Sequence, residues 1–338
     1  MKPTTQLLTR RESLKQIGVS GMLGVAALTL PEIAFAHSAT RFAPLPASDI
    51  SGVYPFKIGN IEAYAISDGQ LTLPASALLG PEASAADRNK VLTDNFLPTD
   101  NVYAGLNLLL LKIGSETILM DTGYGTLGGP TSGKAIARLT AAGFPPDKIT
   151  ALILSHIHPD HIGGLLGANG ASPFTNAQYF VSKAEVDYWS GTPDLSKARV
   201  DASFKEVVAK LGKAGVEAIK GKMNLISPGD KIISGIEAVN ASGHTPGHIA
   251  LKITSGNEQL LTIGDAAHHH VLMFAHPEWT VAFDSDPAEA VKARRRLFTS
   301  AAADKTLVLG NHMPFPGLGH IRKKGSGYEW IQAPYREA

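Results

Sequence analysis

The chain has 338 residues, of which 44% are hydrophobic, and its 31 lysines and arginines nearly balance its 30 aspartates and glutamates. This composition supports a large folded core, and a near-neutral charge without a basic stripe argues against nucleic acid as a partner. Because the chain has no cysteine, disulfides, thiolate metal ligands and a cysteine nucleophile are excluded.

The N-terminus resembles a bacterial twin-arginine export signal. Arg10-Arg11 precedes a mildly apolar, glycine-containing run over 17–30, and "AFA" at 34–36 has the small-x-small pattern of a cleavage site. The apolar run is shorter than the roughly 20 residues that span a bilayer, which argues against a stable membrane anchor. We therefore expect a signal peptide over 1–36 and a periplasmic or secreted protein, with a lead-in segment over 37–55.

The remaining chain, 56–338, is expected to form a single domain. Hydrophobic alternation and apolar runs predict a hairpin and further strands over 56–73, 107–123, 149–156, 177–183, 231–243, 248–256, 258–265, 306–312 and 328–335. Apolar residues at helical spacing predict helices over 132–144, 204–219 and 286–303, the last capped by Asp284 or Asp286. The segment 83–98 is expected to be a loop with weak helical character. This mixture predicts two mixed sheets with helices outside.

The stretch "SHIHPDHIGG" gathers four side chains of metal-ligand type within six positions. His156 and His158 are two residues apart on an extended segment, so their side chains point to the same side. Pro159 ends that geometry, and Asp160 and His161 follow it. Scattered polar loop residues are the alternative, but they would not cluster so densely where a buried strand ends. The pattern predicts a metal site of nitrogen and oxygen ligands.

This motif, His156-x-His158-x-Asp160-His161, resembles the signature of the metallo-β-lactamase superfamily. Further motifs of that family follow in its order: an early "DTG" at 121–123, "GHTPGH" beginning at Gly243, "GD" at 264–265 and "LVLGNH" ending at His312. Together they span roughly residues 56 to 320.

The resemblance implies an α/β fold, the αββα sandwich of two mixed β-sheets flanked by helices, with two divalent metals, most often zinc. It assigns one metal to His156, His158 and His244, the other to Asp160, His161 and His312, and the bridging position to Asp265. Two cations about 3.5–4 Å apart share a water and lower its pKa, and the resulting hydroxide attacks an electrophilic centre. Asp160 and Asp265 are thus expected to serve catalysis through the metals.

Three other side chains are expected beside the ligands. Asp121 is expected to accept a hydrogen bond from the far N–H of a ligand imidazole, with a simple turn cap as the alternative. His248 is expected to support the ligands from outside or to be structural. His268 is expected to project toward the metals and to donate a proton, whereas a solvated histidine run is the alternative for His269 and His270.

Several branches of the superfamily fit poorly. The chain after His312 is too short for the added helical domain of glyoxalase II, and Asp265 argues against true β-lactamases, which lack a bridging aspartate. The segments "VDYW", "FDSDP" and "NHMPFPGLGHIRKKGSGYEWIQAPY" resemble the exported methyl-parathion-hydrolase-like group, which includes organophosphate triesterases and related lactonases. Parathion hydrolase has an aliphatic residue where His268 stands, whereas lactonases often place a proton-donating tyrosine there.

We therefore favour a zinc-dependent hydrolase that opens lactones or cleaves aryl esters. An organophosphate triester hydrolase is the first alternative, and a non-catalytic metal-binding protein on a hydrolase scaffold is the second. The expected partner is a small-molecule ester, lactone or phosphotriester, and the sequence leaves a monomer or a homodimer open. Candidate pocket residues, for which core packing is the alternative, are the aromatics Tyr188, Trp189, Phe274 and Phe315.

Overall fold

The computed structural model describes residues 52–80, 82–167 and 170–335, so the predicted signal over 1–36 lies outside the described residues, as does most of the lead-in segment. The first strand, β1, spans Val53–Ile58 and so begins three residues before the expected domain start at 56. Within the described ranges, no helix is long and apolar enough to cross a membrane.

The first sheet has the strand order β1 to β7, in the order of the chain. Strands β1 to β4 are antiparallel neighbours, and β4 to β7 are parallel. After β1, the strands are β2 Ile61–Pro74, β3 Asn101–Ile113, β4 Glu116–Met120, β5 Ala151–Leu154, β6 Gln178–Ser182 and β7 Met223–Ile226. All four residues of β5 are buried, as its continuous apolar run predicts for a strand covered on both faces.

The second sheet has the order β14-β13-β12-β11-β10-β9-β8. Only the pair β11 and β12 is parallel among the neighbours of this sheet. Its strands are β8 Lys231–Ile233, β9 Ile236–Asn240, β10 Ile249–Ser255, β11 Glu258–Thr262, β12 Leu307–Leu309, β13 Leu318–Lys324 and β14 Gly327–Gln332.

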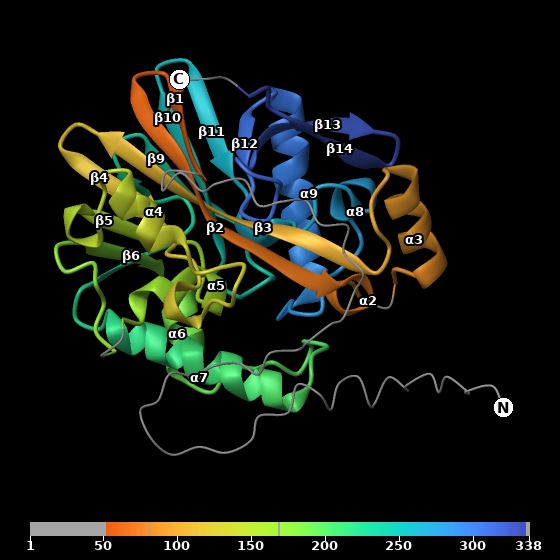
Figure 1. Cartoon of the computed structure of the whole chain (residues 1–338), viewed down its shortest axis with the longest axis horizontal. Helices are drawn as coiled ribbons and strands as arrows, with labels where there is room; N and C mark the ends of the chain where they lie inside the picture. Colours follow the sequence, from red (N-terminus) through yellow and green to blue (C-terminus); the bar gives the residue numbers. More distant parts are fainter. Residues whose placement is uncertain (1–51, 81, 168–169, 336–338) are drawn as a thin grey trace.

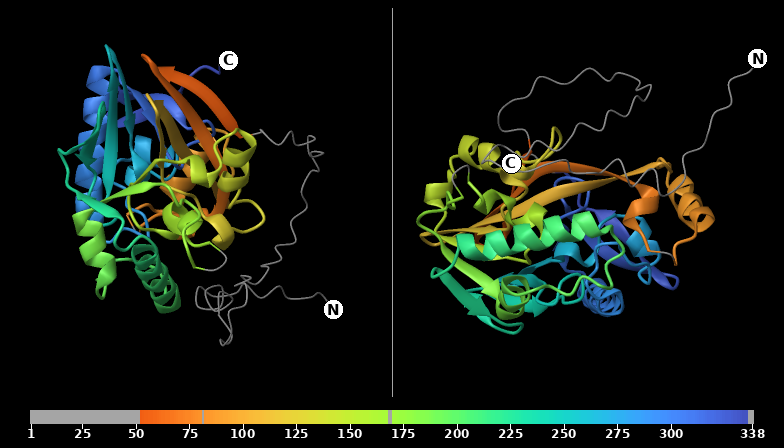
Figure 2. Two further views of the ribbon diagram at one scale, coloured as in Figure 1. Left: turned by 90° about the vertical axis from the view of Figure 1, so that its left-hand side faces the viewer. Right: turned by 90° about the horizontal axis from the view of Figure 1, so that it is seen from below.

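The helices cover the outer faces of the two sheets (Figure 1, Figure 2). The α-helices are α2 Ala75–Leu78, α3 Ala85–Asp94, α4 Ala135–Ala141, α5 Pro159–Ile162, α6 Lys183–Ser190, α7 Ala202–Ala218, α8 Leu272–Ala275 and α9 Pro287–Asp304. Short 3₁₀ turns occupy Gly125–Leu127, Pro146–Lys148, Gly163–Leu165 and Gly264–Ala266. The predicted cap of α9 is Asp286, whose side chain accepts the N–H of Glu289.

Three apolar cores hold these layers together. The inner faces of both sheets share one core, which contains Leu109 of β3 and Leu251 of β10. A second core packs α4, α6 and α7 onto the first sheet, and a third packs α3, α8 and α9 onto the second. The arrangement is an αββα sandwich of two mixed sheets, which confirms the predicted fold class.

The segment 83–98 differs from the expected loop, because it contains the ten-residue helix α3. Ser84 caps the helix by accepting the N–H of Asp87, and the buried Leu92 anchors it to the third core. Leu92 is the only buried residue of this helix, so no apolar stripe at helical spacing marks it in the sequence. The Ser84 cap and tertiary packing stabilise a helix that the hydrophobic pattern of this segment does not predict.

Candidate metal centre

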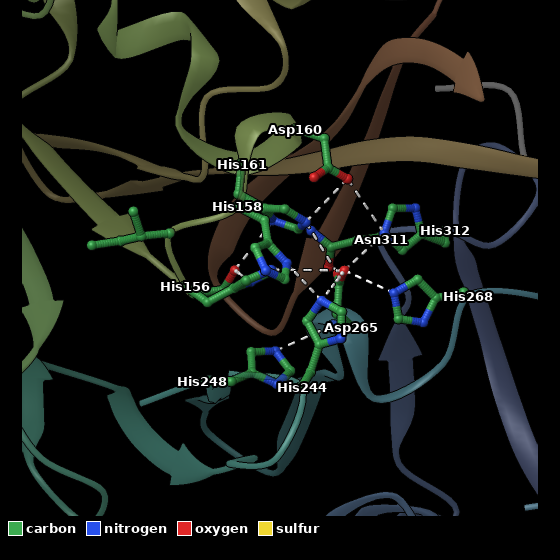
Figure 3. Close-up of polar contacts among 12 residues, drawn as sticks. His156, His158, Asp160, His161, His244, His248, Asp265, His268, Asn311 and His312 are labelled. Atoms are coloured by element: carbon green, nitrogen blue, oxygen red, sulfur yellow. Dashed lines mark hydrogen bonds and ion pairs between the residues drawn. The ribbon is translucent and has the colours of Figure 1, made fainter. Parts of the chain in front are cut away.

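Four buried side chains from three loops form the first ligand group. His156 and His158 follow β5, His244 lies between β9 and β10, and Asp265 follows β11; one ligand atom from each lies within 4.8 Å of the others. His158 Nδ1 is 2.8 Å from His244 Nε2, and His244 Nε2 is 3.2 Å from Asp265 Oδ2. The two sheets therefore meet at this group (Figure 3).

The second ligand group contains Asp160, His161, Asp265 and His312, again with ligand atoms within 4.8 Å. His161 Nε2 lies 3.1 Å from Asp265 Oδ1, and His312 Nε2 lies 3.1 Å from Asp265 Oδ2. Asp160 Oδ2 is 3.5 Å from His161 Nε2 and 3.6 Å from His312 Nε2. Asp265 belongs to both groups and stands between them, in the position that a bridging carboxylate requires.

The local backbone explains how one short motif serves both groups. His158 is the extended residue that precedes α5, and Pro159 opens that helical turn, where its fixed φ is favourable. The turn carries Asp160 and His161 toward the second group. Gly163 follows, and a Cβ there would lie 2.1 Å from the carbonyl oxygen of Tyr124, so only glycine allows this close approach.

The donor set fits two borderline-hard divalent cations. Buried atoms that have no hydrogen-bond partner include His156 Nε2, His161 Nε2 and Asp265 Oδ1, and each of these belongs to a ligand group. Unpaired buried polar atoms are costly, so their gathering in the two ligand groups indicates cations that satisfy them. Imidazole nitrogens with carboxylate oxygens, and no thiolate, suit zinc and similar divalent ions.

The electrostatics of the centre favour positive charge. Burial raises the pKa of Asp265, but the imidazoles of His312 and His161 outweigh burial and hold this pKa well below its usual range. Burial lowers the pKa of His244, yet hydrogen bonds to Asp265 and Asp284 raise it to about 9. The buried carboxylates therefore attract protons or cations to the same nitrogens.

Asp121 lies just outside the second group, as expected from the sequence. Its Oδ2 is 2.8 Å from His161 Nδ1 and also accepts the hydroxyl of Ser155, while Oδ1 accepts the N–H of Ser155. Asn311 Nδ2 donates to the same Oδ2 at 3.2 Å. With Nδ1–H held in this way, Nε2 of His161 is left free to face Asp265.

Two other contacts orient the first group. His244 Nδ1 is 2.9 Å from Asp284 Oδ1, and Asp284 Oδ2 accepts the N–H of Val281. His248 Nε2 accepts the N–H of Asp265 at 3.2 Å, and burial lowers the pKa of His248 to about 3, so this ring is neutral. His248 thus holds the backbone of the shared aspartate rather than a cation.

Glu185 of α6 ties the two histidine loops together. This fully buried carboxylate accepts the N–H of Ile157 at 2.9 Å and the N–H of Gly247 at 2.8 Å. Trp189 Nε1 also donates to it at 2.8 Å, and the ring of Trp189 packs edge-on against His158 at 5.7 Å. The carboxylate therefore fixes the spacing between the backbones that carry His158 and His244.

His268 approaches both groups, as its place after Asp265 in the sequence predicts. Its Nε2 lies 3.0 Å from Asp265 Oδ2, and its ring stacks on that of His312 with centroids 4.8 Å apart. Burial lowers its pKa to about 4, although the charge of Asp265 opposes this, so the ring is neutral near pH 7. Its Nδ1 is buried without a hydrogen-bond partner.

The two following histidines are not a solvated run. His269 is only 3% exposed, and its Nδ1 accepts the N–H groups of Val271 and Leu272 at the start of α8. His270 is partly buried, and burial lowers its pKa to about 4. His269 caps a helix, a role that a histidine triplet does not reveal in sequence.

Acid should destabilise the protein through His269. Burial, aided by the charge of His270, lowers its pKa to about 3, whereas an unfolded histidine titrates near 6.5. The unfolded state therefore binds the extra proton first, and stability is lost as the pH falls from about 6.5 toward 3, by up to about 1.4 kcal/mol for each pH unit.

A His269→Asn variant keeps a side-chain acceptor for the α8 backbone but does not titrate. Urea unfolding of both proteins in one metal-supplemented buffer, at pH values from 7.5 to 4.5, should show a shallower decline for the variant. Parallel declines would mean that other buried groups account for the acid sensitivity.

The predicted aromatic pocket needs correction. Trp189 and Phe274 are 0% and 1% exposed and belong to the cores that attach the helices, so core packing describes them. The hydroxyl of Tyr188 donates to the carbonyl of Asp194. Phe315, by contrast, is 40% exposed and lines a cavity of about 480 Å³.

Sequence reasoning missed Glu185, Asp284 and Asn311. Each reaches the centre from an element whose own pattern is that of an ordinary helix or loop. Asp284 belongs to "FDSDP", a segment that indicates the family resemblance but does not indicate what its carboxylate contacts. Asn311 directly precedes the ligand His312, and this position is the one signal that could have identified it. Glu185 has no local signal, because its partners are 28 and 62 residues away in the chain.

The chain matches the model of a known protein family. The model for the metallo-beta-lactamase superfamily matches residues 106–312, a span that includes every residue of both ligand groups. Among curated proteins, an N-acyl homoserine lactonase of Bacillus cereus is 26% identical over 181 residues, which is 53% of this chain and 62% of that protein. The match thus spans about three fifths of that relative's length.

Two solved structures are similar over nearly their whole length. AidC, a dizinc quorum-quenching lactonase in complex with a homoserine product, superposes with a TM-score of 0.82 and 31% identity, covering 86% of this chain and all of that chain. The hydrolase AbOPH of the beta-lactamase superfamily has a TM-score of 0.76 and 27% identity, covering 85% of this chain and 99% of that one.

Proposed function

This chain belongs to the metallo-beta-lactamase superfamily, and we propose that it is a dinuclear, zinc-dependent hydrolase that opens lactones and cleaves activated aryl esters. The observation that carries the proposal is the position of Asp265, which is shared by two largely buried ligand groups and has the neutral His268 at 3.0 Å. A protein that only stores metal needs neither a shared carboxylate nor a neutral imidazole beside it. The likeness to a dizinc lactonase over its full length supports the same function.

In the proposed hydrolysis, different residues would hold the cations, orient the ligands and assist the leaving group. His156, His158 and His244 would hold one cation, Asp160, His161 and His312 would hold the other, and Asp265 would touch both. When bound, two such cations lower the pKa of a shared water and polarise the oxygen of an ester or lactone carbonyl. Asp121 and Asp284 fix the ring orientations of His161 and His244. His268, as a neutral imidazole, is placed to donate a hydrogen bond to the oxygen that leaves.

The proposal is tested on purified protein expressed with added zinc. Elemental analysis should find about two zinc ions per chain, and the protein should hydrolyse an acyl homoserine lactone and a nitrophenyl ester. A strong chelator should abolish both activities, and zinc should restore them. Bound metal without turnover of any lactone, ester or phosphotriester would leave only a metal-binding protein. Turnover of the phosphotriester alone would instead favour the organophosphate triesterase.

A His268→Leu variant should shift the balance between substrates. Leucine removes a hydrogen-bond donor beside the leaving oxygen, and one such donor is worth about 10²–10³-fold for a poor leaving group and less for a good one. Lactone kcat/KM should therefore fall by at least about 10²-fold. Any turnover of a nitrophenyl phosphotriester should hold or rise, since nitrophenolate leaves readily. The measurement is kcat/KM for both substrates, with zinc content determined for each protein.

Because His268 also contacts Asp265, two outcomes would contradict its role as a donor to the leaving oxygen. If both substrates lose activity equally and zinc content falls, His268 acts by supporting the shared aspartate. Unchanged lactone turnover would show that the donor is another group.

A further inference from the structure

A cavity of about 480 Å³ lies beside the candidate metal centre. Its wall includes Gly105, whose carbonyl oxygen accepts a hydrogen bond from His312 Nδ1 at 2.9 Å. Phe315 and His270 also line it, and they follow His312 and His268 by three and two residues. The cavity therefore adjoins the centre through Gly105 and through the segments that carry His268 and His312.

The wall of this cavity is cationic. Lys134 and Arg138, at the start and in the middle of α4, both line it, and no aspartate or glutamate does. Among the described residues, neither cation forms an ion pair within 4 Å of a carboxylate, whereas lysines and arginines elsewhere on the surface do. The guanidinium of Arg138 donates one bond, at 2.6 Å, to the carbonyl oxygen of Ser67.

The nearby carboxylate of Asp68 forms no ion pair within 4 Å with Lys134 or Arg138. Asp68 is fully buried, and it accepts three backbone N–H groups, those of Tyr124, Gly133 and Ala135, at 2.9, 3.0 and 2.7 Å. These bonds organise the loop that ends in Lys134. Asp68 attracts Arg138 from beyond ion-pair distance.

The remaining wall is amphipathic. Tyr103 and Phe315 are 47% and 40% exposed, which leaves aromatic surface for an aliphatic chain. Gln70 and Thr131 add hydrogen-bonding groups at the same wall. Aromatic surface in the same cavity as two cations without an ion pair matches an acyl chain that carries an anionic oxygen group.

We propose that this cavity receives the acyl chain of the substrate and that Lys134 and Arg138 bind a carboxylate at the end of that chain. The favoured esters or lactones would then be those whose acyl chain ends in a carboxylate. The proposal rests on the hydrolase function proposed above and adds the chemical class of the substrate to it. Because charged pairs in a half-open cavity are screened by salt, the preference should weaken as ionic strength rises.

Two nitrophenyl esters of equal chain length test the proposal. One is nitrophenyl octanoate, and the other is the nitrophenyl half-ester of octanedioic acid, which differs only in its terminal carboxylate. The wild-type protein should show the higher kcat/KM for the half-ester. A Lys134→Met change should lower the ratio of the two kcat/KM values roughly two- to tenfold through KM. The matched control is Lys148→Met, an exposed lysine away from the cavity, which should leave the ratio unchanged.

A binding measurement keeps the test independent of turnover. Calorimetric titration of octanedioate and octanoate should show tighter binding of the dianion to the wild type, and the difference should shrink in Lys134→Met and with added salt. Equal kcat/KM values for the two esters together with equal binding of the two acids would overturn the proposal. Failure to hydrolyse either ester, with the dianion still favoured in binding, would instead count against the hydrolase function alone.

Discussion

Replacement of Asp265 by asparagine is expected to lower kcat/KM for a lactone by at least about 10³-fold. The carboxylate stands between the two ligand groups, with Oδ1 facing His161 and Oδ2 facing His312 and His244. An amide keeps the shape but loses the charge that the two proposed cations would share. Charge stabilisation of this kind is worth several kcal/mol, and each 1.4 kcal/mol is about a factor of ten.

The measurement pairs kinetics with zinc analysis. Asp265→Asn should retain at most about one zinc ion per chain, and its far-UV circular dichroism should match that of the wild type. Asp94→Asn is the matched control, because Asp94 is an exposed carboxylate at the end of α3 whose partner is Lys90. Full activity in Asp265→Asn with two ions bound would refute the bridging role.

Arg294→Met should cause the largest loss of folding stability. Arg294 lies on α9 and is 0% exposed, and its guanidinium donates to the carbonyl oxygens of Ala266, Pro277 and Trp279. These carbonyls belong to the segment that carries Asp265 and His268. Methionine of similar length leaves all three without their donor in a buried setting. We expect the free energy of unfolding to fall by about 3–5 kcal/mol and the Tm by roughly 10 °C.

The neighbouring Arg295 provides the control. It lies on the same helix, but its side chain is 43% exposed, and its partner is the exposed Glu278 at 3.1 Å. Arg295→Met should change stability by less than about 1 kcal/mol. Thermal and urea unfolding of the two variants beside the wild type make the comparison, and equal losses would show that the buried contacts of Arg294 contribute little.

The parts of the site that could be predicted from the sequence lie in short continuous segments of the chain. His156 to His161 lie within one loop, and the loops that carry His244, Asp265 and His312 each follow or precede a readable strand. The cluster at 156–161 predicted a metal site, and the resemblance of the motifs to the metallo-β-lactamase superfamily implied both ligand groups. Contacts between distant segments could not be read, because nothing near Glu185 or Asp284 in the chain indicates which backbone or ring each will meet.

The same limit explains the errors in the aromatic residues and in α3. A tryptophan near a metal motif fits a pocket or a core equally well by type, and only the packing of α6 places Trp189 in the core. The helix α3 depends on its Ser84 cap and on Leu92, a single buried contact whose partners lie elsewhere in the fold. Hydrophobic periodicity detects a helix or strand face that buries several residues, but it does not detect a helix that packs through a single buried residue.

Because both sheets supply ligands to each group, metal binding should stabilise the whole fold. The first sheet carries His156, His158, Asp160 and His161, but the loops of the second carry His244, Asp265 and His312, so neither sheet alone completes either group. Metal that binds only the assembled protein stabilises it by mass action, by about 1.4 kcal/mol per site for each tenfold rise in free ion above the Kd. The folded fraction, and with it resistance to proteolysis, would then follow the free metal concentration around the protein.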